Sequence, residues 1–500
     1  MADSLRADVV IVGAGSAGCV LAARLSEDPA RSVVLLESGP VPRDAGAFAP
    51  GVLDAGTVRG SVPGQAINWT IPGRIGPSRD YTTVRGRMLG GSSSINGGYF
   101  IRPRLADFAD WAAVGGPEWS YERALPRMVA LEHDLDYPAS AIHGDHGPIL
   151  VSRGGSDEPT AVILAAAAEA SGYPQEPDKN DQGAPGYGPV PTNTAGGVRQ
   201  NAGLAYVLPV MSRPNLTVLG DRTVSRVLLR GGRAIGVEYR TGSELHLAFA
   251  DLVVLSAGAI GSAQLLIASG IGPEGELRRL GVPVAVPAPG VGASFSDHPQ
   301  LTVEWWPRPP IPSSEASWLA GALHTEEIEV LASAKSMTQL TGQGSGGPLP
   351  LLVSVMTPRP TGRLRLRSAD PATPPLLDYG YLDSAKARRE LRDALRLVLE
   401  LLETPSWRAA RDPGDHPGPA DRDDAGLDAW IAEHLGTAMH TTGTVPLGPD
   451  GPVDSSGRVL GVDGLIVADA GILPTGPRRG PALAAVLIGE TISDAIRRRA

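Results

Sequence analysis

The sequence has a single cysteine and no long apolar run, and both absences narrow the classes of protein to consider. Cys19 is the one cysteine among 500 residues, which excludes an intramolecular disulfide framework and any zinc cluster built on cysteines. No uninterrupted apolar stretch approaches the length needed to cross a bilayer, and the first residues lack the charged start and apolar core of a signal peptide. We therefore expect a cytoplasmic protein without an integral membrane segment.

Positive charge is also scarce, and this disfavours one large class of partner. The chain has 44 Lys and Arg against 54 Asp and Glu, a net charge of -10. Such a chain repels a phosphate polyanion, so no nucleic-acid partner is expected. With 42% hydrophobic and 20% charged residues, the composition is that of an ordinary globular enzyme, and the length predicts two domains.

The most informative feature that is present is a glycine-rich turn near the N-terminus. An apolar run predicts a buried parallel strand, and Gly13, Gly15 and Gly18 follow it at the spacing of a dinucleotide-binding turn. Gly13 permits the tight turn, Gly15 lets the backbone approach a pyrophosphate, and Gly18 lets the next helix lie close to the strand. A second predicted strand, residues 32–36, ends at Glu37, whose carboxylate can accept hydrogen bonds from ribose hydroxyls. This pattern predicts a dinucleotide whose phosphates face the helix N-terminus.

The rest of the chain alternates between strand-like and helical patterns. Buried strands are predicted at residues 216–219, 225–229, 234–239, 251–256 and 464–470, and helices at residues 159–171, 384–403 and 482–498. Alternating apolar and polar residues at 301–306 and 362–367 predict an antiparallel sheet with one face exposed to water.

A second run of small residues, Gly86 to Gly98, is rich in glycine and serine. Combined with the N-terminal turn, it resembles the first signature of the glucose-methanol-choline (GMC) family of flavin oxidoreductases. The residues that carry this match are Gly86, Leu89, Gly90, Gly91, Ser92, Ser93, Ile95, Asn96, Phe100 and Pro103. Residues 258–273 are similar to the second signature, with Ala263 in place of the usual proline, and residues 467–475 are similar to a further landmark. The resemblance spans nearly the whole chain.

The resemblance implies an α/β fold in which a Rossmann-like FAD-binding domain accompanies a discontinuous α+β substrate domain built on an antiparallel sheet. The FAD-binding domain is expected to comprise residues 1–150, 196–296 and 435–500, the last of which carries the catalytic histidine. The substrate domain is expected to comprise residues 151–195 and 297–434.

The same resemblance implies which residues bind FAD. They are Gly13, Gly15, Ser16, Ala17, Gly18 and Glu37 at the ADP half, Val224 beside the adenine, Gly91, Ser92, Asn96 and Gly97 along the flavin, and Asp469 and Ala470 at the ribityl-phosphate side. Some family members attach the flavin covalently through a histidine in the glycine-serine loop. Ile95 stands at that position and the loop has no histidine, so noncovalent FAD is expected.

His440 is the candidate catalytic base, because its surroundings are similar to the family's His-x-x-Gly-Thr motif. The implied reaction is oxidation of a primary or secondary alcohol, in which His440 takes the hydroxyl proton and flavin N5 takes the hydride. The electrons then leave to a quinone, a carrier protein or oxygen. His298 is expected to have a structural role beside Asp297. His143 and His146 lie in a turn with glycine and proline, where a loop is expected rather than a metal site.

One position departs from the family pattern. Ala482 stands where the family has a second histidine or asparagine, and alanine cannot hydrogen-bond a substrate oxygen. Three readings stay open: His440 acts alone, a neighbour such as Arg479 substitutes, or ordinary turnover has been lost. The alternative functions are therefore a non-redox lyase and a non-catalytic flavin-binding protein of the same fold. The modest length and residues 96–100 also resemble members associated with mycofactocin, in which the reduced cofactor, mycofactocinol, would be the alcohol oxidised for electron transfer.

Overall fold

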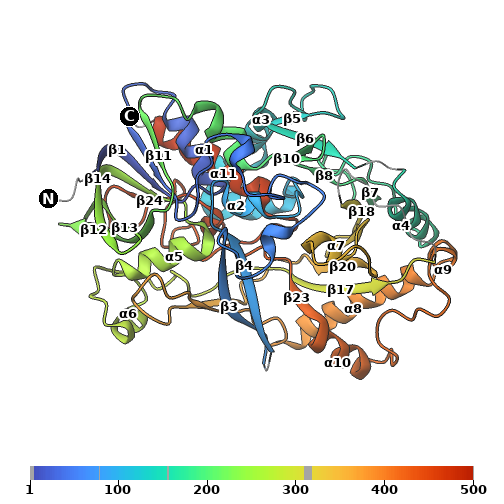
Figure 1. The fold of residues 1–500 in the computed structure, drawn as a ribbon. Coiled ribbons are helices and arrows are strands. Elements are labelled where there is room, and N and C mark those ends of the chain that lie inside the picture. Colours follow the sequence, from blue (N-terminus) through green and yellow to red (C-terminus); the bar gives the residue numbers. More distant parts are fainter. Residues whose placement is uncertain (1–4, 78, 155–156, 309–317, 499–500) are drawn as a thin grey trace.

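The computed structural model describes residues 5–77, 79–154, 157–308 and 318–498, and two large sheets organise it (Figure 1). The first sheet has seven strands in the order β11-β2-β1-β14-β13-β12, and β24 pairs with β14. Its strands are β1 (Leu5–Val12), β2 (Val33–Leu36), β11 (Leu216–Leu219), β12 (Thr223–Arg230), β13 (Arg233–Thr241), β14 (Glu244–Leu255) and β24 (Leu465–Val467). Each of the strands predicted from the apolar runs is thus present in this sheet.

Parallel pairing brings the carboxyl ends of five strands to one edge of this sheet, because Leu219 at the end of β11 also lies level with Leu36. Val12 lies level with Leu36 on one side and with Leu255 on the other, and Leu255 pairs in turn with Val467. The chain segments that follow β1, β2, β11, β14 and β24 therefore meet at the same edge, which is where ligands bind in open α/β sheets.

Two helices pack together beside this edge. Helix α1 (Ser16–Leu25) lies against helix α11 (Ala482–Arg497), and a side chain on Gly489 would come within 2.7 Å of Val20. Glu490 joins them by accepting hydrogen bonds from Arg24, and its exposed fraction is only 8%. The first and last helices of the chain are thereby fixed to each other.

The second sheet has six strands in the order β23-β17-β20-β19-β18-β7, all antiparallel. Its strands are β7 (Tyr187–Gly188), β17 (Pro299–Trp305), β18 (Leu319–His324), β19 (Ile328–Ser333), β20 (Leu349–Val355) and β23 (Leu435–Thr437). A mixed α/β sheet with five parallel strands and a separate antiparallel sheet are the two parts of the predicted fold class, which is confirmed.

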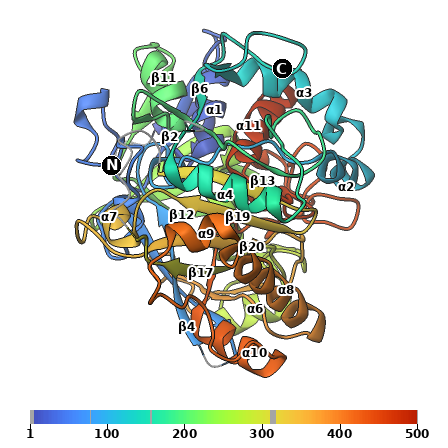
Figure 2. The same cartoon turned by 90° about the vertical axis from the view of Figure 1, so that its right-hand side faces the viewer.

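The expectation that one face of the antiparallel sheet is exposed to water holds along β17, where buried residues alternate with Thr302 and the exposed Glu304, but it is wrong for β18, β19 and β20. Almost every residue of β18, β19 and β20 is buried. Helices α4 (Pro159–Ala170) and α8 (Ala385–Leu402) pack on these strands, and Figure 2 shows both helices together with α9 (Pro405–Ala410) in front of the sheet. The run at 362–367 also belongs elsewhere, because β21 (Arg363–Arg365) pairs with β22 (Leu376–Asp378) in a different sheet.

That third sheet is a hairpin extended by two short strands. Its order is β21-β22-β3-β4, and the hairpin strands are β3 (Asn68–Gly76) and β4 (Arg79–Gly86). Strand β4 leads directly into the glycine-serine loop. In Figure 1 the hairpin lies between the two large sheets.

The remaining elements are short helices and strand pairs around this framework. The helices are α2 (Leu105–Gly115), α3 (Tyr121–Leu131), α5 (Gly258–Ala268), α6 (Glu274–Leu280), α7 (Met337–Thr341) and α10 (Asp424–His434). The strands are β5 (Glu132–Asp134), β6 (Ile149–Arg153), β8 (Pro191–Thr192), β9 (Thr194–Ala195), β10 (Val198–Arg199), β15 (Ile271–Gly272) and β16 (Val286–Pro287). Within the described ranges, no helix has the length and apolar character that a membrane crossing requires.

Candidate active site

One cavity of about 600 Å³ runs from the carboxyl edge of the parallel sheet to the antiparallel sheet. It is lined by every predicted site residue but one. These are Gly13, Gly15, Ser16, Ala17, Glu37, Gly91, Ser92, Asn96, Gly97, Val224, Asp469, Ala470 and the candidate base His440. The exception is Gly18, which faces the turn instead.

The glycine turn has the geometry that its sequence predicts. Gly13 has φ +96°, a conformation that L side chains rarely adopt. A side chain on Gly18 would place its Cβ 1.9 Å from the carbonyl oxygen of Gly13, so this position admits only glycine while α1 stays in place. A side chain on Gly91 would likewise come within 2.7 Å of Gly15 Cα, which shows how closely the glycine-serine loop crosses the turn.

Glu37 holds the glycine turn from the end of β2. Its carboxylate accepts hydrogen bonds from the backbone N–H groups of Ala14 at 2.8 Å and Gly39 at 2.9 Å. Burial raises the pKa of Glu37 to about 7, although these hydrogen bonds act in the opposite direction. The spacing of Glu37 from the glycine turn predicted a contact with ribose. It did not indicate that Glu37 also anchors the turn itself.

Asp469 occupies the matching position after β24. It accepts hydrogen bonds from the Ser262 hydroxyl at 2.5 Å and the Gly471 N–H at 2.8 Å. Burial raises the pKa of Asp469 to about 6. Both acids in the cavity are therefore shifted toward the neutral form, which lessens their repulsion of an anionic ligand.

Three helices begin at the cavity wall, and the N-terminus of each is free of a side-chain cap. These are α1, α5 and α11, whose first residues Ser16, Gly258 and Ala482 all line the cavity. The first backbone N–H groups of a helix lack partners inside the helix and attract anions. The closely approached glycines and these N-termini fit the diphosphate and ring system of the FAD that the family resemblance implies.

The position of a covalent flavin link is occupied by an apolar side chain. Ile95 is 4% exposed, lines the cavity and packs so closely on Gly60 that a Cβ there would lie 2.5 Å from it. Among the described residues that line the cavity, His440 is the one histidine.

His440 is held by its backbone and by a second histidine. Asp297 accepts a hydrogen bond from the His440 N–H at 2.7 Å and another from the Thr441 hydroxyl at 2.6 Å. Met439, just before it, has φ +61°, which is unusual for a residue with a side chain. Such conformations persist where surrounding contacts impose them and concentrate at functional sites.

His298 contributes more than its sequence position predicted. Asp297 accepts the His298 N–H at 2.8 Å, but the His298 ring also points at the candidate base, with its Nδ1 2.9 Å from Nδ1 of His440. Burial, followed by the His298 ring, lowers the pKa of His440 to about 4. The two histidines are 142 positions apart, so no local pattern could reveal the contact.

Ala482 lies in the cavity wall at the start of α11, and its equivalence to the family's second histidine or asparagine stays a prediction. The suggestion that Arg479 takes over its role is wrong. Arg479 is 1% exposed and absent from the cavity wall; its guanidinium donates to the Glu176 carboxylate and to the Lys179 carbonyl oxygen, both at 2.6 Å.

The end of the cavity near the antiparallel sheet is mainly aromatic and aliphatic, a feature that no motif marked. Its walls include Trp69, Tyr81, Trp318, Leu340 and Leu352. At this end of the cavity, the charged side chain among the described residues is Arg85. It donates a hydrogen bond to the Thr441 hydroxyl at 2.7 Å.

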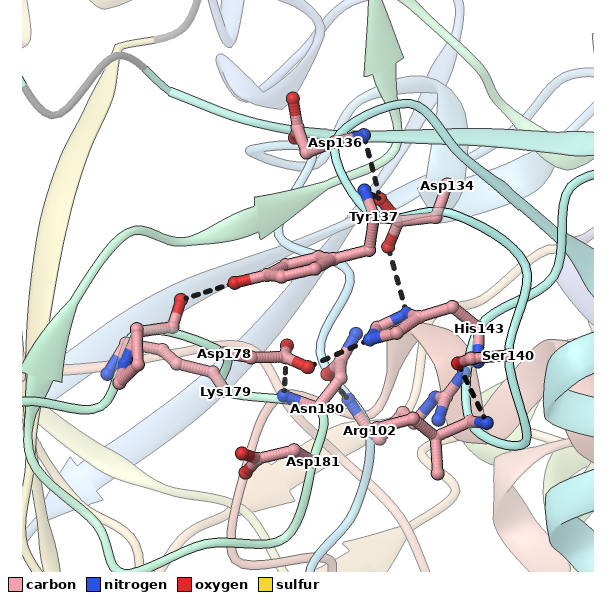
Figure 3. Close-up of polar contacts among 12 residues, drawn as sticks. Arg102, Asp134, Asp136, Tyr137, Ser140, His143, Asp178, Lys179, Asn180 and Asp181 are labelled. Carbon is pink, nitrogen blue, oxygen red and sulfur yellow. Dashed lines mark hydrogen bonds and ion pairs between the residues drawn. The ribbon is translucent and has the colours of Figure 1, made fainter.

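The two histidines of the turn at 143–146 lie in different environments. His146 is exposed, whereas His143 is buried among carboxylates (Figure 3). Its Nε2 lies 2.8 Å from Asp178, and its Nδ1 lies 3.2 Å from Asp134 and 3.4 Å from Glu132. Burial opposes a charge on this ring, but the hydrogen bonds to Asp134 and Asp178 outweigh burial and raise the pKa of His143 to about 10.

Two arginines complete this buried cluster. Arg102 donates to Glu132 at 2.6 Å and Arg153 donates to Asp134 at 2.8 Å. Glu132, Asp134 and His143 lie close enough to hold a metal ion, but Arg102 and Arg153 already pair with the two carboxylates. The cluster instead ties down the segment 176–181, because Asn180 accepts the backbone N–H of Arg102.

Comparison with known proteins gives a consistent result over the chain. The GMC oxidoreductase N-terminal family model matches residues 7–300, and the C-terminal model matches residues 358–489. An uncharacterised GMC-type oxidoreductase of Rhodococcus erythropolis is 36% identical over 99% of both chains. Human mitochondrial choline dehydrogenase is 32% identical over 98% of this chain and 89% of its own. The structure of pyridoxine 4-oxidase from Mesorbium loti superimposes with a TM-score of 0.90 at 28% identity, over 98% of this chain and 99% of that one.

Proposed function

The chain belongs to the GMC oxidoreductase family, and from that premise we propose that it oxidises an alcohol with His440 as the base. The observation that carries the proposal is that the predicted cofactor residues and His440 line one continuous cavity. Members of this family bind FAD, and the helix N-termini and glycines at the sheet edge fit it. When bound, FAD supplies the acceptor for the hydride that leaves the carbinol carbon.

We carry the FAD contacts that the family resemblance implies over to the residues that line the cavity. We assign the ADP half to the turn formed by Gly13, Gly15 and Ser16 with Ala17, and to Glu37. We assign the adenine to Val224, the flavin to Gly91, Ser92, Asn96 and Gly97, and the ribityl-phosphate side to Asp469 and Ala470. Because Ile95 offers no nucleophile, the attachment is noncovalent.

His440 is suited to accept the hydroxyl proton of the substrate. A pKa of about 4 means that its ring is neutral at physiological pH and carries a free lone pair. Asp297 accepts the His440 backbone N–H and the neighbouring Thr441 hydroxyl, so this segment is already ordered before the substrate binds. The apolar walls beside it exclude water that would compete for the proton.

The lining near His440 favours an uncharged alcohol over a quaternary ammonium alcohol such as choline. Strands β3, β4, β17 and β20 and the segment 436–441 contribute no carboxylate to the described cavity wall, and Arg85 adds a positive charge. Aromatic faces attract cations, but Arg85 opposes them at short range. The acceptor that reoxidises the flavin is a quinone, a carrier protein or oxygen.

Anaerobic titration tests the proposal. Purified protein, loaded with FAD, is mixed with a panel of alcohols, and the flavin absorption at about 450 nm is followed. We expect bleaching by at least one neutral alcohol and weaker bleaching by choline. A flavin that stays oxidised with every alcohol while the protein consumes a cyanohydrin would instead indicate a lyase.

A further inference from the structure

We propose that His298 is the positioning residue that fixes which ring nitrogen of His440 carries a proton, leaving Nε2 of His440 free to accept the proton of the alcohol. This inference rests on the proposed function, in which His440 is the base.

The two rings meet edge to face through one pair of nitrogens. Nδ1 of His298 and Nδ1 of His440 are 2.9 Å apart, and the ring planes lie at 82°. His298 is 1% exposed, whereas His440 reaches the cavity, so His298 acts on the substrate only through His440. Asp297 accepts the backbone N–H of both residues, which fixes the pair as one unit.

A hydrogen bond between two neutral Nδ1 atoms has one proton, and its location decides the chemistry. If His298 donates, His440 carries its own proton on Nε2 and cannot accept another there. If His440 donates, its Nε2 bears the lone pair. The second arrangement is therefore the one that a base requires.

The surroundings of Nε2 of His298 favour the arrangement in which His440 donates from its Nδ1. Nε2 of His298 has no partner that meets hydrogen-bond distance and angle, and the acceptor beside the ring is the carbonyl oxygen of Pro477. A carbonyl oxygen cannot donate, so a proton on Nε2 of His298 is favoured over a lone pair. A neutral ring with that proton presents Nδ1 as an acceptor, and His440 must then donate to it.

The proton transfer balances without a further partner. The O–H bond of the alcohol breaks and an N–H bond forms at Nε2 of His440, which becomes an imidazolium. The proton on Nδ1 of His440 stays bonded to that nitrogen and hydrogen-bonded to Nδ1 of His298, so His298 accepts a stronger hydrogen bond but gains no proton. The charged groups around the imidazolium are Asp297 and Glu329, which favour it, and Arg85, which opposes it.

Two variants of His298 separate this role from packing. Asparagine places a carbonyl oxygen near the position of Nδ1 and can still accept from His440, whereas leucine fills similar space and accepts nothing. We expect His298→Leu to slow anaerobic flavin reduction by about 100-fold or more, as expected for a base in the wrong tautomer, and His298→Asn by about 10-fold or less. Substrate affinity and the flavin spectrum should change little in either, and His146→Leu on the surface is the matched control.

The pH profile of flavin reduction is a second test. It uses the asparagine variant and can therefore be carried out even if the leucine variant does not fold. The His298 ring lowers the pKa of His440, so its replacement by asparagine should move the acid limb of the profile to higher pH. Equal rates in the two variants, or an acid limb that does not move, would overturn the inference. Unchanged reduction in His440→Ala would instead overturn the proposed function, and so distinguishes the two failures.

Discussion

At the scale of single residues, burial shifts the pKa values of acidic and basic side chains in opposite directions within the same cavity. It lowers the pKa of His440 and raises that of Asp469, because a charge is disfavoured wherever water is excluded. A base needs a neutral ring, and a site for a diphosphate needs little negative charge of its own. Burial therefore favours the uncharged form of the base at one end of the cavity and of the acid at the other.

Replacement of His440 tests its role as the base. His440→Ala and His440→Asn should each lower kcat/KM by about 10²- to 10⁴-fold, because the proton of the alcohol loses its acceptor. Asparagine keeps a polar group of similar shape without basicity, so the two variants should behave alike. Flavin absorbance of each purified variant serves as the control for an intact cavity.

Position 482 tests whether the substrate oxygen lies near the start of α11. Ala482→Asn should raise kcat/KM for small alcohols about fivefold, since one neutral hydrogen bond contributes about 1 kcal/mol. Ala482→Val takes up space without offering a hydrogen bond and should give no gain. Identical kinetics in the two variants would place the substrate oxygen out of reach of this position.

The sequence indicated which residues lie in the site, but it did not indicate which side chains they contact. His440 and Ala482 were identified because each belongs to a motif read along the chain. The contact of His298 with His440 was missed, because it arises from the pairing of β17 with β23 and not from any local spacing. Arg479 was misjudged for the same reason, since its partner Glu176 is 303 positions away.

At the scale of elements, the site forms where the parallel strands of the first sheet end at the same edge. The apolar runs predicted β1, β2, β11, β14 and β24 correctly, because a strand buried on both faces leaves a continuous apolar pattern. The exposed face predicted for the antiparallel sheet is found along β17, but the corresponding face of β18, β19 and β20 is covered. The helices that cover it, α4 and α8, come from distant parts of the chain, and alternation within a strand carries no information about them.

Two glycines in helices provide a matched test of the α1 turn. Gly18→Ala should cost about 1–3 kcal/mol and release FAD, because its Cβ would overlap the Gly13 carbonyl oxygen. Gly275→Ala in α6 has open space around it and should stabilise the protein by up to about 1 kcal/mol. Chemical unfolding and retained flavin absorbance measure both effects. A Gly18→Ala protein as stable as wild type and still yellow would contradict the packing described for α1.

At the scale of the whole molecule, the cavity lies between the two large sheets, and buried charges connect the segment 176–181 to the residues that precede α11. The cluster around His143 holds the segment 176–181, and that segment in turn accepts the guanidinium of Arg479 two residues before Pro481. The division into domains at residues 150, 195, 296 and 434 stays a prediction, although the two sheets agree with its general outline.

The His143 cluster predicts how stability depends on pH. The pKa of His143 is about 10 in the folded protein and 6.5 as the reference value, so its stabilisation is complete below pH 6.5 and is lost as pH rises through 10. His143→Gln should therefore lower the free energy of unfolding by about 2–4 kcal/mol at pH 6 and by less at pH 10. His146→Gln, at an exposed neighbour, should change neither value. Parallel losses at both pH values would contradict a charged His143.

The most direct measurement is single-turnover reduction of bound FAD by an alcohol, recorded without oxygen for the wild type and His440→Ala side by side. We predict rapid bleaching at about 450 nm in the wild type and bleaching at least about 100-fold slower in the variant, with equal FAD content. Equal rates in both proteins, or no bleaching of the wild type by any alcohol of the panel, would contradict the assignment of this cavity to alcohol oxidation.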